Sequence, residues 1–135
     1  MAYTRKVQYY ETDKMGIVHH SNYIRWFEEA RTAYMLEKGI DYDNVEKDGI
    51  MMPVLGVECK YKHGAKYNEI VTIDTSVSFF NGIKLIFSYM VKNTDGDVLV
   101  TGSSTHCFVG LDFKPLRIKR TNPVFYDSIN SLLEK

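Results

Sequence analysis

Apolar residues recur at helical spacing in the segment that runs from Ser21 or Asn22 to Lys38. At about 100° per residue, one narrow arc of this segment holds Tyr23, Phe27, Ala30 and Tyr34, flanked by Trp26 and Ala33. Either Ser21 or Asn22 can cap the N-terminus, and Gly39 is the residue expected just past the C-terminus. The pattern therefore predicts a long helix that buries an aromatic stripe along one side.

After residue 50 the apolar period changes to two, which is typical of strands with one buried face. The buried set is expected to comprise Leu55, Val57, Cys59, Tyr61, Val71, Ile73, Val77, Phe79, Ile83, Leu85, Phe87, Tyr89 and Val91. The pair Asn81-Gly82 and the sequence TDGD mark two turns, and a further strand follows in VLVTGSSTHCFVG. The small residues Gly102, Ser103 and Ser104 predict the close approach of another backbone.

Two shorter segments complete the predicted fold. TRKVQYY is a candidate first strand, and PVFYDSINSLLEK is a short C-terminal helix, because Asn122 and Pro123 form a cap followed by a first-turn proline. The order is strand, long helix and four antiparallel strands joined by hairpins. We therefore expect an α+β fold in which an antiparallel sheet of about five strands curls around one long central helix. No repeat, low-complexity tract or linker is evident, so a single domain over residues 1–135 is expected.

Composition narrows the class of protein. Lys plus Arg and Asp plus Glu each number 17, and the formal net charge of zero gives no electrostatic reason to expect nucleic acid or an anionic membrane as a partner. No apolar run approaches the roughly 20 residues of a spanning helix, and the N-terminal residues lack a signal-peptide core. A cytoplasmic protein without membrane insertion is expected. Cys59 and Cys107 lack C-x-x-C spacing and are expected to be buried thiols.

The segment YETDKMGIVHHSNY, residues 10–23, places titratable groups directly before the predicted helix. A helix N-terminus presents unpaired N–H groups and a positive dipole end, which would stabilise an oxyanion. Asp13 lies upstream, and Gly16 permits a tight turn between the two. A carboxylate on one side of a carbonyl carbon, acting as base or nucleophile, is a workable minimum for acyl transfer to water. The spacing alone also fits a structural role for Asp13.

The motif Y-x-E-T-D-x-x-G-I-V-H-H-S-N-Y, followed by FEEART, resembles the signature of the hotdog-fold 4-hydroxybenzoyl-CoA thioesterase family. It is most similar to the bacterial Tol–Pal-associated acyl-CoA thioesterase branch. The match is specific over residues 9–34 and looser over nearly all of the rest. The resemblance implies a hotdog fold, hydrolysis of acyl-CoA to a free acid and coenzyme A, and a homodimer or homotetramer with shared active sites.

Carried over residue by residue, the family's catalytic aspartate matches Asp13. The position whose backbone N–H binds the thioester carbonyl falls at His20. The other matched positions are expected to contact substrate or to shape the site, and they are Glu11, Gly16, His19 and Asn22. His19 stands where many members carry an aromatic residue, which leaves the preferred acyl group open.

The acyl group and the phosphates of coenzyme A need binding sites of their own. In the family the long helix also lines the acyl tunnel, so Tyr23, Trp26 and Phe27 are expected to influence chain length. Two basic clusters compete for the phosphates: Lys114, Arg117, Lys119 and Arg120 in KPLRIKR, and Lys60, Lys62 and Lys66 in KYKHGAK. Each cluster is also typical of a solvated surface or a charge-protected sheet edge.

No metal and no tightly bound cofactor are expected. The adjacent His19 and His20 would point to opposite sides of an extended segment, and the sequence has no H-x-x-x-H pair. His106 shares a strand face with apolar residues and is expected to be a hydrogen-bonded core histidine.

Two other functions stay open beside the thioesterase. A hotdog domain that binds acyl-CoA without hydrolysing it would need the tunnel but not the carboxylate. A hotdog dehydratase or hydratase would need a histidine and an acid, such as His19 or His20 with Glu28, placed for proton transfer. The sequence also leaves open the acyl class and whether coenzyme A or acyl carrier protein carries it.

Overall fold

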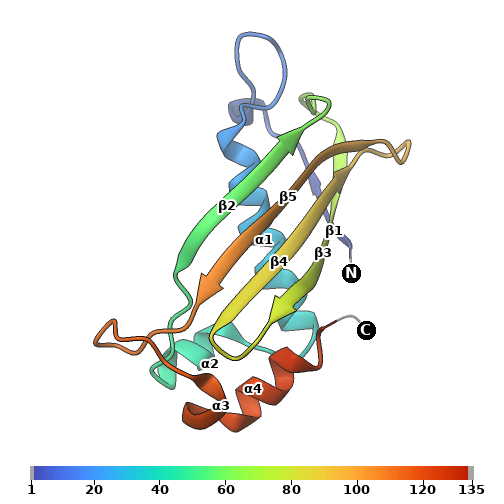
Figure 1. Ribbon diagram of the computed structural model, residues 1–135. Coiled ribbons are helices and arrows are strands. Elements are labelled where there is room, and N and C mark those ends of the chain that lie inside the picture. The colour runs from blue at the N-terminus through green and yellow to red at the C-terminus, as the bar shows by residue number, and fades with distance from the viewer. Residues whose placement is uncertain (1, 134–135) are drawn as a thin grey trace. The chain divides into compact units, whose positions relative to one another are not determined.

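The computed structural model of the protein describes residues 2–133. The strands are β1 (Ala2–Lys6), β2 (Val54–Tyr61), β3 (Ile70–Phe80), β4 (Lys84–Lys92) and β5 (Val98–Cys107). The helices are the 3-10 helix η1 (Tyr9–Glu11), α1 (Ser21–Glu37), α2 (Tyr42–Lys47), α3 (Ile118–Thr121) and α4 (Pro123–Asn130). The five strands form one sheet in the order β1-β3-β4-β5-β2 (Figure 1). The predicted α+β class and the five-stranded antiparallel sheet are confirmed.

The place of β2 corrects the prediction of four strands joined in succession by hairpins. β3, β4 and β5 are neighbours in chain order, as the two predicted turns require. β2 instead lies beside β5 at one edge of the sheet, and β1 pairs with β3 at the other, with Ala2 opposite Asp74. The chain therefore crosses over between β2 and β3, a long-range pairing that local turn signals do not encode.

The described residues group into two compact units by their internal contacts. The first takes residues 2–34, 58–75 and 89–102, and the second takes residues 35–57, 76–88 and 103–133. Each is described separately below. The expected single domain over residues 1–135 stays a prediction.

The core of the first unit forms around the N-terminal part of α1. The predicted aromatic stripe is buried, and its members Tyr23, Trp26, Phe27, Ala30 and Tyr34 are each at most 6% exposed. Phe27 stacks on Tyr89 of β4 with ring centroids 4.3 Å apart. A Cβ added at Gly102 would lie 2.5 Å from the Phe27 ring and 2.6 Å from the Glu58 carbonyl oxygen. The close approach predicted at the small residues of β5 is thus confirmed at Gly102.

The second unit contains the C-terminal turn of α1 and an aromatic cluster. The N–H of Gly39, at φ 82°, donates to the carbonyl of Leu36, and the Ile40 N–H donates to the carbonyl of Met35. This pair of bonds is a Schellman motif, and it ends α1 at the predicted glycine. Elsewhere in the unit, Phe108 packs edge-on against both Phe80 and Phe125.

The C-terminal helix begins as predicted and ends earlier. The Asn122 side chain accepts the N–H of Phe125 at the start of α4, and Pro123 is its first residue. α4 ends at Asn130 instead of continuing through the predicted segment, of which residues 134 and 135 lie outside the described residues. The short α3 directly precedes α4 and lies against it (Figure 1).

His106 of β5 is a buried histidine, as predicted. Its Nε2 lies 2.8 Å from the Ser104 hydroxyl, and its ring meets Phe87 edge-on. The free thiols of Cys59 and Cys107 are only half-buried, in contrast to the prediction.

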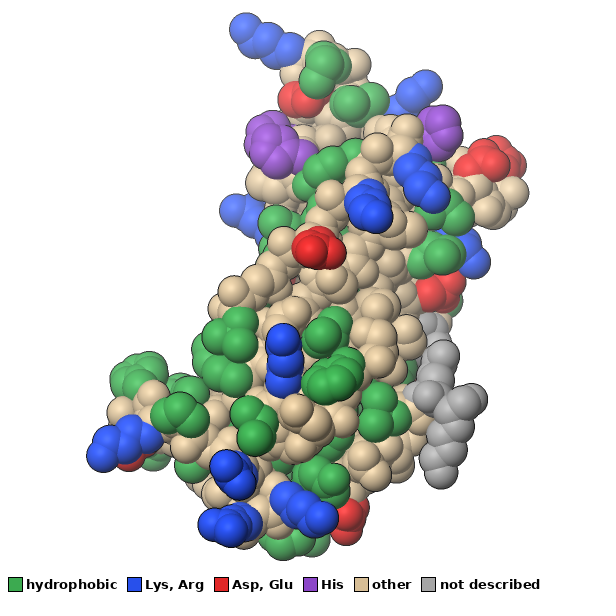
Figure 2. Space-filling model, in the orientation of Figure 1, with side chains coloured by type: hydrophobic (Ala, Val, Ile, Leu, Met, Phe, Trp, Pro, Cys, Tyr) green, Lys and Arg blue, Asp and Glu red, His purple; other side chains and the backbone are tan. Residues whose placement is uncertain are grey.

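The predicted apolar face of β2 is exposed. In this edge strand Leu55, Val57 and Tyr61 are 60%, 36% and 50% exposed, although the Tyr61 ring still packs against Tyr23. Phe79 is exposed, in contrast to the prediction, since the alternation of β3 shifts by one residue before the turn and buries Phe80 instead. Ile83, between β3 and β4, is also exposed, in contrast to the prediction. Exposed apolar side chains are visible over the strands in Figure 2. No helix within residues 2–133 is long and apolar enough to span a membrane.

Candidate active site

The loop that carries Asp13 is closed by its own backbone. The Asp13 N–H donates to the carbonyl of Ile17 at 2.9 Å, and the Gly16 N–H donates to the carbonyl of Asp13 at 3.0 Å. Gly16 has φ 80°, a conformation that glycine adopts at little cost, so the predicted tight turn is confirmed. The Met15 N–H donates to Asp13 Oδ1 at 2.8 Å. Within residues 2–133 no partner is recorded for the other carboxylate oxygen, Oδ2.

The far side of this loop is attached to the segment after β2. The Val18 N–H donates to the carbonyl of Ala65 at 2.8 Å, and Ile17 forms a β-bridge with Lys66. Gly64 permits this approach, since a Cβ there would lie 2.8 Å from Ile17. The loop is therefore held between its own turn and residues 64–66, which limits where the Asp13 carboxylate can move.

The start of α1 differs in detail from the predicted cap. The imidazole Nδ1 of His19 accepts the Ser21 N–H at 3.3 Å and lies 2.9 Å from the Ser21 hydroxyl, so His19 takes the capping role. The Asn22 side chain points elsewhere and donates to the carbonyl of Glu11 at 2.9 Å. The backbone N–H of His20 has no hydrogen-bond partner among the described residues. This free donor lies at the positive end of a helix of 17 residues.

A pocket of about 190 Å³ is lined by both of the residues predicted to be catalytic. Its lining residues are Asp13, Met15, Ile17, Val18, His20, Tyr23, Tyr61, Lys62, His63 and Gly64. All of them belong to the first unit. A larger hollow of about 490 Å³ shares Ile17, His63 and Gly64 but contains neither Asp13 nor His20. The smaller pocket is therefore the candidate active site.

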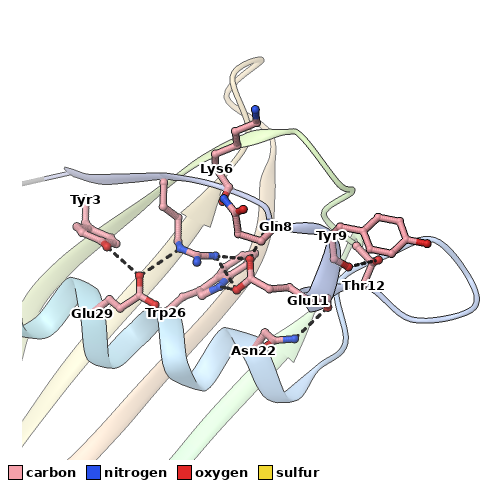
Figure 3. A network of polar contacts seen from close by, with 10 residues as sticks. Tyr3, Lys6, Gln8, Tyr9, Glu11, Thr12, Asn22, Trp26 and Glu29 are labelled. Atoms are coloured by element: carbon pink, nitrogen blue, oxygen red, sulfur yellow. Dashed lines mark hydrogen bonds and ion pairs between the residues drawn. The ribbon is translucent and has the colours of Figure 1, made fainter.

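Glu11 is the centre of a buried polar network and is itself only 3% exposed (Figure 3). Arg5 Nη1 donates to both carboxylate oxygens, at 2.8 and 2.9 Å. The Gln8 N–H and the Trp26 indole Nε1 donate to the same carboxylate at 2.8 and 2.7 Å. Burial by itself would raise the pKa of Glu11, but the hydrogen bonds from Arg5, Gln8 and Trp26 outweigh it, so the pKa lies below its usual value.

The backbone of Glu11 extends this network to the site. Its carbonyl accepts the N–H of His19 at 2.8 Å as well as the Asn22 side chain. Arg5 also pairs with Glu29 at 3.2 Å and lies 4.7 Å above the Trp26 ring. β1, α1 and the residues on both sides of the Asp13 loop are therefore joined at Glu11, which supports the site from behind rather than lining its pocket.

The family model of the thioesterase-like superfamily matches residues 7–126. This chain belongs to that superfamily. A Bacillus subtilis (strain 168) protein that carries the provisional name acyl-CoA thioesterase YneP is 35% identical over 119 residues, which cover 87% of this chain and 86% of the relative. The 4-hydroxybenzoyl-CoA thioesterase of Pseudomonas sp. (strain CBS-3) is 24% identical over 99 residues, 70% of each chain.

A solved thioesterase structure has the same fold as this chain. The DHNA-CoA thioesterase from Staphylococcus aureus has a TM-score of 0.92 and 34% identity, and the match covers 96% of this chain and 88% of that one. The hotdog fold, the resemblance to 4-hydroxybenzoyl-CoA thioesterases and the thioesterase class are thereby confirmed. The closer placement in the Tol–Pal-associated branch stays a prediction.

The structure of this chain brings only some of the predicted site residues together. Of those expected to bind substrate, Tyr23 and Lys62 line the pocket, and Gly16 shapes its loop. Trp26 and Phe27 are fully buried against Glu11 and Tyr89 and do not line it.

The remaining basic residues lie apart from the pocket lining. Lys60 is exposed and outside it, while Arg117 and Lys119 are exposed residues of the second unit. The Nζ of Lys119 lies 5.6 Å from the centre of the Tyr126 ring. A phosphate site at either basic cluster stays a prediction.

Tyr61 and His63 line the pocket and were absent from the predicted site. The signal for them was their place in KYKHGAK, the segment whose lysines were predicted to compete for the phosphates of coenzyme A. Burial, together with a hydrogen bond to the Cys59 thiol, raises the pKa of Tyr61 to about 12. Within residues 2–133, no group of three or more His, Cys, Asp or Glu side chains could hold a metal ion.

Proposed function

We propose that this chain is an acyl-CoA thioesterase in which Asp13 is the base and the His20 backbone N–H binds the thioester carbonyl. One observation carries the proposal: Asp13 and His20 line the same pocket, and within residues 2–133 neither Asp13 Oδ2 nor the His20 backbone N–H has a hydrogen-bond partner. The thioesterase class of the superfamily supports the reaction type. The assignment of these two residues is the new part.

The proposed reaction uses one water molecule and no other co-reactant. The Asp13 carboxylate takes a proton from water while the water oxygen attacks the thioester carbonyl carbon, and the carbonyl electron pair moves onto its oxygen. The His20 N–H and the helix dipole stabilise that oxyanion. When the carbonyl re-forms, the C–S bond breaks and the thiolate leaves with the electron pair. The thiolate then takes the proton held by Asp13, giving a free acid and a thiol.

The first test is thiol release from a panel of acyl-CoAs, from acetyl to palmitoyl and including benzoyl, by wild type and Asp13→Asn. Loss of a general base typically costs 10²–10⁴-fold in rate, so we expect turnover of the best substrate to fall by about that factor. Asp112→Asn is the matched control. Asp112 accepts a loop N–H in the same way, from Lys114 at 3.0 Å, but lies in the second unit. Its turnover should equal that of wild type.

The same assay separates the other functions. Binding of acyl-CoA without thiol release by wild type would favour a non-catalytic acyl-CoA-binding domain. Absorbance from a conjugated enoyl thioester, without free thiol, would favour a dehydratase. Full activity of Asp13→Asn would leave the thioesterase in place and overturn the role of Asp13.

We also propose a cytoplasmic homodimer formed through β2. Two features of β2 support pairing with a second copy: it is an edge strand, and its apolar residues Val54, Leu55 and Val57 are exposed. The phosphates of coenzyme A would bind to a basic cluster. Lys62 is a candidate phosphate ligand, because it belongs to the pocket lining.

A further inference from the structure

The hydroxyl of Tyr23 is a buried polar group that the proposed reaction does not use. Tyr23 is 2% exposed and lines the pocket beside Asp13 and His20. Its hydroxyl oxygen accepts the N–H of Ala65 at 3.1 Å. Among the described residues, no acceptor is recorded for the hydroxyl proton. A buried donor without an acceptor is costly, so this proton is suited to an acceptor that enters the pocket.

The surroundings of Tyr23 favour a neutral hydroxyl held in one orientation. Burial raises the pKa of Tyr23 despite the hydrogen bond from Ala65, so the group stays protonated near neutral pH and acts as a donor. Its ring packs edge-on against Trp26 at 4.9 Å and tilted against Tyr61 at 5.6 Å. The ring is held by its aromatic neighbours and the oxygen by the Ala65 N–H. The hydroxyl proton is therefore the part of Tyr23 that can form a new hydrogen bond.

Tyr23 also lies on the same turn of α1 as the free backbone donor. It is the third residue of the helix, and its own N–H donates to the carbonyl of His20 at 3.3 Å. Long side chains in helices lean toward the N-terminus, which directs the Tyr23 ring back over the helix start. Tyr23 and His20 therefore line one pocket from the same end of α1.

We propose that Tyr23 is a catalytic residue whose hydroxyl donates a second hydrogen bond to the thioester carbonyl oxygen, beside the His20 N–H. The inference rests on the proposed thioesterase function. The hydroxyl proton stays on Tyr23 throughout, so the proton balance of the reaction is unchanged. The bond strengthens as negative charge develops on the carbonyl oxygen and therefore lowers the barrier more than it tightens substrate binding.

The test compares Tyr23→Phe with wild type on the best substrate of the acyl-CoA panel. Loss of one oxyanion donor typically costs 10²–10³-fold in kcat, so we expect kcat to fall by about 10²-fold with KM nearly unchanged. Tyr34→Phe is the matched control, since Tyr34 is a buried tyrosine of the same helix outside the pocket lining. Its kcat should match wild type. A kcat for Tyr23→Phe within threefold of wild type would overturn the inference and leave the thioesterase function intact.

A second measurement covers the case in which Tyr23→Phe fails to fold, because the change also removes the acceptor of the Ala65 N–H. Fluorotyrosine placed at position 23 keeps the hydroxyl but ionises at lower pH. If Tyr23 must donate, the alkaline limb of the kcat/KM profile moves to lower pH by the difference in pKa between tyrosine and fluorotyrosine. An unmoved limb would overturn the inference. Absence of thiol release by wild type on the whole panel would instead overturn the proposed function itself.

Discussion

The side chain and the backbone of Glu11 serve different neighbours. The carboxylate accepts from Arg5, Gln8 and Trp26, whereas the carbonyl accepts from His19 and from the Asn22 side chain. The first set holds β1 to α1, and the second holds the chain on both sides of the Asp13 loop. A change at this residue should therefore affect stability and the placement of Asp13 together.

Glu11→Ala should destabilise the protein by about 3–5 kcal/mol, because it leaves the Arg5 charge buried without its main partner. Urea unfolding followed by Trp26 fluorescence measures the loss. Glu29→Ala is the matched control: Glu29 also pairs with Arg5, but its side chain is 39% exposed, so its loss should be well below that of Glu11→Ala. Equal losses in the two variants would contradict a central role for Glu11.

The lowered pKa of Glu11 predicts an acid-dependent loss of stability. The carboxyl binds its proton at lower pH in the folded chain than in the unfolded chain, where its usual pKa is 4.5. Its contribution is therefore fully present above pH 4.5 and is lost as the pH falls through the lower folded value. Unfolding midpoints measured from pH 6 to pH 2.5 should fall more steeply for wild type than for Glu11→Gln. Parallel curves would count against this assignment.

For single residues, the sequence predicted the candidate catalytic residues better than the residues that hold them in place. The apolar pattern locates the helix start, and the family resemblance singles out Asp13 and His20 beside it, two residues that line one pocket in the structure. The role of Glu11 depends on Arg5 and Trp26, which are distant in the chain. A buried tryptophan whose N–H needs an acceptor was the available signal.

Among the elements, β5 packs tightly against α1 and β2 at Gly102. The ring of Phe27 and the carbonyl of Glu58 occupy the space that a side chain would need. The contact depends on the absence of a Cβ, since the carbonyl belongs to the backbone and cannot rotate away.

Gly102→Ala should therefore cost about 1–3 kcal/mol of stability, as overpacking in a core typically does. Gly56→Ala is the matched control, because a Cβ at Gly56 in β2 would meet nothing within 4 Å. Thermal unfolding of both variants beside wild type measures the difference. A Gly102→Ala variant as stable as Gly56→Ala would show that Phe27 can move aside.

The elements themselves were predictable where the signals are local. α1 carries a period of 3.6 and ends just before Gly39, and Asn122 caps α4, which starts at Pro123, so both helices were located from sequence. The position of β2 beside β5 depends on pairing between strands far apart in the chain. The alternation within each strand reports a buried face but not the identity of its neighbour.

For the whole molecule, the exposed edge strand β2 is the feature that points to assembly. Its place at the end of the strand order and its exposed apolar side chains are the two features that support the proposed homodimer. Neither composition nor zero net charge indicates this, because an edge is defined only once the order of the strands is known.

Val57→Lys should shift the proposed dimer toward monomer, because it places a charge in the middle of the exposed apolar edge. Sedimentation velocity over a range of protein concentrations measures the shift. Leu36→Lys is the control, since Leu36 is an exposed apolar residue on α1, away from β2. A wild-type protein that sediments as a monomer at every concentration would contradict the proposed dimer.

The proposed oxyanion donor at the start of α1 is the backbone N–H of His20, an exposed residue of the pocket lining. Every residue type except proline supplies the same N–H. Under the proposed mechanism, substitution of His20 would therefore change the side chain at the pocket and keep the donor. A lineage could then exchange this residue in single steps, changing the acyl group that the pocket accepts while retaining activity.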